Sequence, residues 1–103
     1  MPKMVKIALT SDLLPGTGNV FETDGGSIAL FNVEGTFYAI DNTCSHRGGS
    51  LGEGKLKGDI VTCPLHGAHF NVKTGAVTFP PARVGVRSFA VKVEGNDILV
   101  ELD

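Results

Sequence analysis

Long apolar runs and basic runs are both missing from this sequence. Its 9 Lys and Arg residues oppose 11 Asp and Glu residues, for a formal net charge of −2. This balance, without aromatic residues interleaved among basic ones, argues against a nucleic-acid partner. No apolar stretch approaches the roughly 20 residues that span a bilayer, and the first residues hold no apolar core of the secretory kind. We therefore expect a cytoplasmic protein with no membrane contact.

Cysteine is scarce as well, with only Cys44 and Cys63 in 103 residues. In a reducing compartment two such residues are expected to be thiols or metal ligands rather than a structural disulfide. A Cys44–Cys63 bridge is the alternative that the sequence leaves open.

Helical periodicity is also absent, and this absence indicates an all-β protein. The 14 glycines and 5 prolines punctuate short runs rich in Val, Ile, Phe and Thr, as expected for strands joined by tight turns. The clearest hairpins join residues 89–93 to 98–102 and 27–33 to 36–40, and each arm of the second is expected to place one face on a core. Further short strands are predicted at 5–8, 20–21, 59–62, 69–71 and 76–78. The length suits a single domain over residues 1–103.

Two Gly-rich loops, at about 41–54 and from 63 onward, interrupt the strand pattern, and they contain the chemistry-bearing residues. The first holds Cys44 and His46, the second holds Cys63 and His66, and residues 47–62 separate them. The pattern is C-x-H followed by C-x-x-H, so each loop offers one thiolate and one imidazole donor. Both cysteines and two of the three histidines of the chain fall into these clusters. We interpret them as one metal site.

The ligand set alone is compatible with two kinds of metal centre. A tetrahedral zinc site uses two cysteines and two histidines, but structural zinc fingers usually pair the two thiolates in one knuckle and the two imidazoles in the other. Mixed pairs suit a binuclear iron–sulfur cluster, in which one iron takes two thiolates and the other takes two imidazoles. The residues favour the cluster and leave zinc as an alternative.

At these residues the sequence resembles the Rieske ferredoxin family. The resemblance extends over nearly the whole chain and is most specific at CSHRGG, CPLHGAHF and FPPARV. It implies an antiparallel β-sandwich with a small cluster-binding subdomain formed by the two Gly-rich loops, about 41–54 and 63–70. It implies that Cys44 and Cys63 bind the inner iron of one 2Fe-2S cluster, that His46 and His66 bind the outer iron, and that a proline loop at about 79–84 covers the cluster.

Departures from the family pattern indicate a low reduction potential. High-potential Rieske proteins carry an extra cysteine in each cluster loop, and Gly49 and Leu65 stand in those places here. They also carry a serine and a tyrosine that donate hydrogen bonds to cluster sulfur, and Ala68 and Phe70 replace them. Donors to sulfur stabilise the more negative reduced cluster, so their absence should lower the potential.

Function follows from what the chain has and lacks. Only His69 remains as a further histidine, too few for the mononuclear iron of an oxygenase, and no Gly-rich dinucleotide fingerprint is present. We expect no enzyme but a one-electron carrier. By resemblance it is a monomeric ferredoxin that passes electrons from a flavoprotein reductase to a terminal ring-hydroxylating oxygenase. The alternatives are a small Rieske-like subunit of an assimilatory nitrite reductase and a zinc-stabilised interaction module.

Overall fold

The computed structural model describes residues 3–23, 26–42, 50–64, 67–79 and 85–102. Its strands in chain order are β1 (Lys3–Leu9), β2 (Gly18–Thr23), β3 (Gly26–Val33), β4 (Thr36–Asp41), β5 (Lys55–Lys57), β6 (Ile60–Thr62), β7 (His69–Asn71), β8 (Val77–Phe79), β9 (Ser88–Phe89), β10 (Val91–Glu94) and β11 (Asp97–Leu102). Two 3-10 turns accompany them, η1 (Thr10–Asp12) and η2 (Leu51–Glu53). The described part contains no α-helix, so the all-β prediction is confirmed.

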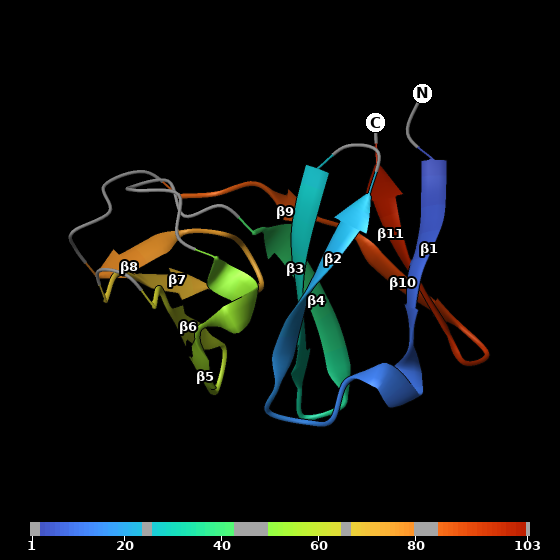
Figure 1. The fold of residues 1–103 in the computed structure, drawn as a ribbon, viewed down its shortest axis with the longest axis horizontal. Helices are drawn as coiled ribbons and strands as arrows, with labels where there is room; N and C mark the ends of the chain where they lie inside the picture. The colour runs from blue at the N-terminus through green and yellow to red at the C-terminus, as the bar shows by residue number, and fades with distance from the viewer. Residues whose placement is uncertain (1–2, 24–25, 43–49, 65–66, 80–84, 103) are drawn as a thin grey trace.

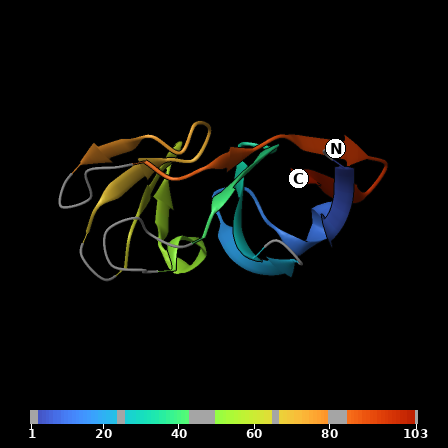
Figure 2. The ribbon, with the colours of Figure 1, turned by 90° about the horizontal axis from the view of Figure 1, so that it is seen from above.

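The strands form three antiparallel sheets arranged side by side (Figures 1 and 2). The outer sheet has the order β1-β11-β10, the middle sheet β2-β3-β4-β9 and the small sheet β5-β6-β7-β8. The outer and middle sheets make the sandwich, and the small sheet lies at the far end of the molecule. All pairings are antiparallel and most join neighbours in sequence, which short turns allow.

The middle sheet is covered on both faces, because β3 alternates between two hydrophobic cores. Ile28 and Leu30 face the outer sheet, where they pack with Ile98 and Val100. Ala29 and Phe31 face the opposite way, toward the small sheet. The arm at residues 27–33 thus places a face on a core, as expected, and buries its other face as well. The continuous apolar run Ile28–Phe31 was the signal, since a strand buried on both sides carries no polar alternation.

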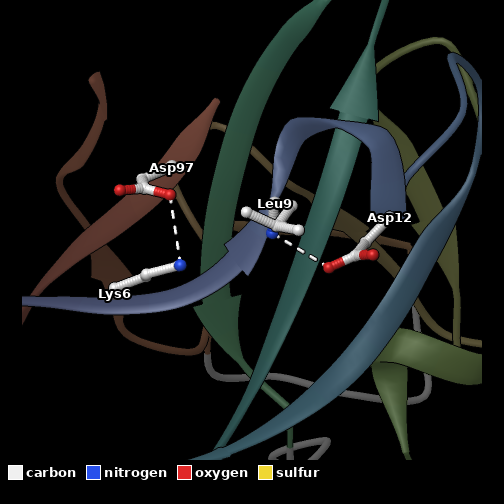
Figure 3. Close-up of polar contacts among 4 residues, drawn as sticks. All are labelled: Lys6, Leu9, Asp12 and Asp97. Carbon is white, nitrogen blue, oxygen red and sulfur yellow. Dashed lines mark hydrogen bonds and ion pairs between the residues drawn. The ribbon is translucent and has the colours of Figure 1, made fainter. Parts of the chain in front are cut away.

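The outer sheet is secured at the end of β1 by two polar contacts (Figure 3). The Lys6 ammonium lies 3.2 Å from the Asp97 carboxylate on β11, and the Asp12 carboxylate accepts a hydrogen bond of 2.9 Å from the Leu9 backbone N–H. Both contacts are exposed, and exposed ion pairs stabilise a fold little. They orient the chain as it leaves the sheet for η1.

The small sheet includes one strand that the sequence did not indicate, at Lys55–Lys57. In this strand only Leu56 is apolar and both lysines are exposed, so it lacks a period-2 pattern long enough to recognise. It pairs with β6, where Leu56 lies opposite Val61. The strands expected at 59–62, 69–71 and 76–78 are confirmed within a residue or two.

Candidate metal centre

Cys63 follows directly after β6, and its side chain lies in the core between the small and middle sheets. It carries a free thiol and is only 1% exposed. Its buried neighbours in that core are Val61, Ala68 and Phe70 from the β6–β7 hairpin, and Phe31 and Ile40 from the middle sheet. Because the Cys63 thiol is free, the structure argues against the alternative of a Cys44–Cys63 disulfide.

Two backbone hydrogen bonds close the loop that Cys63 begins. The Cys63 N–H donates to the Ala68 carbonyl at 2.7 Å, and the Gly67 N–H donates to the Cys63 carbonyl at 3.0 Å. Gly67 has φ +76, a conformation that residues with a Cβ rarely adopt. These contacts set the two ends of the loop side by side at the end of β6 and β7.

Ala68 and Phe70, the two positions where the family's sulfur-directed donors are replaced, are both fully buried. They belong to the same core cluster as Cys63. Neither side chain has a hydroxyl, so the surroundings of the Cys63 thiol are apolar on this side. A buried apolar environment favours the less charged form of any group placed in it.

The first Gly-rich loop is anchored by Asn42, a residue that sequence reasoning did not single out. The Asn42 amide donates to the Ser50 hydroxyl at 3.0 Å, and its carbonyl oxygen accepts from the Gly52 N–H at 2.7 Å. Its backbone carbonyl accepts from the Leu51 N–H at 2.8 Å. The residues on either side of segment 43–49 are thereby held together.

The segment that contains the predicted proline loop is anchored at its far end. The Val86 N–H donates to the Gly75 carbonyl at 2.8 Å, and the Asp41 N–H donates to the Arg87 carbonyl at 2.8 Å. Gly75 has φ +80, and a Cβ there would collide with the Val86 carbonyl. The turn between β7 and β8 is thus packed backbone against backbone on residues 85–87.

Of the four predicted ligands, only Cys63 lies within the described residues. Cys44, His46 and His66 lie outside them, as do Gly49, Leu65 and Pro80–Pro81. Within the described part no group of three or more His, Cys, Asp or Glu side chains is close enough to hold a metal. His69, the third histidine, lies half-buried on β7, where a strand residue was expected.

Comparison with known proteins agrees with this arrangement. Residues 3–90 match the Rieske 2Fe-2S domain. The chain is 45% identical over 100 residues to the ferredoxin component of biphenyl 2,3-dioxygenase from Rhodococcus jostii, with 97% of this chain and 94% of that protein covered. A structure of carbazole 1,9a-dioxygenase, described as a complex of reduced oxygenase and oxidized ferredoxin, matches with 38% identity and a TM-score of 0.89, covering 94% of this chain and 91% of that one.

A nitrite reductase protein shares the fold at lower sequence identity. A Mycobacterium tuberculosis structure described as the small subunit of an NADH-dependent nitrite reductase has a TM-score of 0.88 at 23% identity, covering 100% of this chain and 97% of that one. That likeness concerns the fold alone. In the described part of the chain no helix has the length and apolarity to span a bilayer.

Cys63, the one predicted ligand within the described residues, suits an iron–sulfur cluster. A bound thiolate is shielded from water when its side chain is buried, and Cys63 is a free, buried thiol at the start of a closed loop. The loop that contains the other cysteine begins next to Asn42, which itself packs beneath η2 through the Gly52 contact. The chain belongs to the family of Rieske 2Fe-2S domains, and a 2Fe-2S cluster is the cofactor of that family.

Proposed function

We propose that Cys44, His46, Cys63 and His66 hold one Rieske-type 2Fe-2S cluster and that the protein carries single electrons between two enzymes. Cys44 and Cys63 bind the inner iron, and His46 and His66 bind the outer iron. What supports the ligand set is the pair of mixed thiolate–imidazole motifs together with the buried free thiol of Cys63. The cluster-binding end then consists of residues 41–54, 63–70 and 79–84 within a domain that extends over residues 1–103.

When bound, the cluster supplies a one-electron couple in the range of roughly −150 to +300 mV that Rieske centres cover. The chain's own residues determine where in this range the couple lies. Phe70, Ala68 and Val61 exclude water from the Cys63 side and offer no side-chain donor to sulfur. We therefore place the potential near the low end. The two histidines are the entry and exit point for electrons.

The partners in this proposal are a flavoprotein reductase upstream and a terminal ring-hydroxylating oxygenase downstream. The observation that carries it is the 45% identity to a biphenyl dioxygenase ferredoxin over nearly the full length of both chains. The ferredoxin–oxygenase complex of carbazole dioxygenase supports the second partner. We place the protein in the cytoplasm as a monomer that serves an aromatic-compound catabolic system.

Absorption and redox titration test the cluster. We expect a red-brown protein with two iron atoms per chain, a visible spectrum that bleaches on reduction and a midpoint at the negative end of the Rieske range. A strongly positive midpoint would contradict the low-potential assignment. A colourless protein with one zinc per chain would replace the proposal with the zinc-stabilised interaction module.

Substitution of the ligands tests the residue assignment. Cys44→Ala and Cys63→Ala should each yield protein without visible absorption or iron, because each removes one of the two cysteines of the chain. His69→Ala serves as the matched control, since His69 is a histidine on β7 that the proposal leaves outside the ligand set. Loss of the cluster in His69→Ala, with retention in Cys44→Ala, would overturn the assignment.

A further inference from the structure

We infer that the hydrogen-bonded pair of Asn42 and Ser50, here named the Asn42–Ser50 clasp, is the positioning device that holds the first cluster-binding loop in its ligating conformation. The inference rests on the proposed function, since it takes Cys44 and His46 as ligands. It adds a role for two residues that bind no metal.

The clasp is built from contacts at both ends of segment 43–49. Asn42 reaches forward to Ser50 through its side-chain amide at 3.0 Å, to Gly52 through its side-chain oxygen at 2.7 Å and to Leu51 through its backbone carbonyl at 2.8 Å. Its own N–H donates to the Ser27 carbonyl on β3 at 3.2 Å. The buried side chain thus ties the exit of the loop to its entry, and the backbone of the same residue ties the entry to the middle sheet.

The other side of the clasp is equally constrained. Gly52 lies so close to β2 that a Cβ would come within 2.6 Å of Val20 and 2.9 Å of the Asn19 carbonyl. Leu51, its neighbour, is fully buried in the core that contains Cys63. The turn η2 is therefore closely packed against β2, and the side-chain contacts of Asn42, together with the backbone bond from the Leu51 N–H, connect the loop entry to it.

The clasp has a specific consequence for a cluster held from two loops. Cys63 is fixed by the core whatever the first loop does, whereas Cys44 and His46 lie within the seven residues between Asn42 and Ser50. If the two ends of that segment separate, the Cys44 thiolate and the His46 imidazole leave the cluster together. Each iron then loses one ligand. The clasp therefore controls the release of the cluster and the uniformity of its ligand geometry, in addition to stability.

The chain offers a matched control in Asn32, the other buried asparagine of the described residues. Its side chain also makes two contacts, donating to the Leu13 carbonyl at 2.9 Å and accepting from the Gly35 N–H at 2.7 Å. It lies on β3 beside the turn to β4, and its contacts tie down segments that contain no predicted ligand. Asn32→Ala and Asn42→Ala thus remove comparable hydrogen bonds from different places.

The experiment compares cluster loss and spectroscopy in the intact holoprotein. The rate of bleaching in the presence of an iron chelator should rise about tenfold or more in Asn42→Ala, as expected when buried hydrogen bonds that hold the ligand loop are lost. Asn32→Ala, compared at the same free energy of unfolding, should bleach at close to the wild-type rate. The electron paramagnetic resonance lines of the reduced protein should broaden in Asn42→Ala and keep their wild-type width in Asn32→Ala.

Milder variants test the pair if Asn42→Ala does not fold. Ser50→Ala should also bleach faster, and Ser50→Thr, which keeps the hydroxyl, should restore the wild-type rate. Suppose the wild-type protein is brown, and Asn42→Ala and Ser50→Ala match Asn32→Ala in bleaching rate and in line width. That result overturns the clasp and leaves the proposed function standing. A wild-type protein that takes up no cluster overturns the proposed function and the clasp with it.

Discussion

Ala68 is a residue at which one added oxygen atom should change the redox behaviour. Its methyl group is fully buried in the same core cluster as Cys63. In Ala68→Ser the added hydroxyl would donate to cluster sulfur and stabilise the reduced form, and we expect the midpoint to rise by about 40 mV, equivalent to about 1 kcal/mol. Redox titration measures the shift, with Ala76→Ser, at an exposed position in the turn between β7 and β8, as the control. An unchanged potential in Ala68→Ser would refute the hydrogen-bond account.

Gly75 is a residue at which a single added methyl group should destabilise the fold. Its φ is +80 and a Cβ would collide with the Val86 carbonyl. We expect Gly75→Ala to lower the free energy of unfolding by about 3 kcal/mol, because backbone strain and collision act together. Gly95 also has a positive φ, of +61, but open space around it, so Gly95→Ala should lose only about 1 kcal/mol. Urea unfolding followed by circular dichroism compares the two, and equal losses would exclude the collision.

At the scale of elements, the β3–β4 hairpin holds one locally unfavourable residue. Glu34 has φ 52 and Gly35 has φ 93, as in a type I′ turn, which favours Asn followed by Gly. Glu34→Asn should therefore raise the free energy of unfolding by about 0.5 kcal/mol. Glu34→Gln removes the charge without this preference and should give no gain. A gain of the same size in Glu34→Gln would assign the effect to charge.

Elements differ in how far their sequences predict them. The alternation in Ile98, Val100 and Leu102 predicts β11, and Glu34–Gly35 predicts the turn between β3 and β4, because both signals are local. The three-residue strand at Lys55–Lys57 carries no such signal. The role of Asn42 could not be predicted, since its partners Ser27, Ser50 and Gly52 become neighbours only after the sheets have formed. The motif C-x-H, C-x-x-H predicts the ligands but not what holds their loops.

At the scale of the whole molecule, the proposed function predicts transient partners. A shuttle should elute as a monomer from a size-exclusion column, accept one electron from a flavoprotein reductase supplied with NADH, and pass it to a ring-hydroxylating oxygenase in stopped-flow measurements. A nitrite reductase subunit would instead copurify with its large partner as a stable complex. Stable copurification with a large partner would decide for the nitrite reductase subunit.

The pairing of β1 with β11 has a consequence for protein engineering. Lys3 lies opposite Leu102, so a polypeptide enters and leaves this module at one point, and that point lies at the end of the molecule away from the small sheet (Figures 1 and 2). Such a module can be spliced into a surface loop of a host protein with little distortion of either. A redox partner tethered to either end of the chain would have the electron donor at a high local concentration, while the end that contains the small sheet stays uncovered.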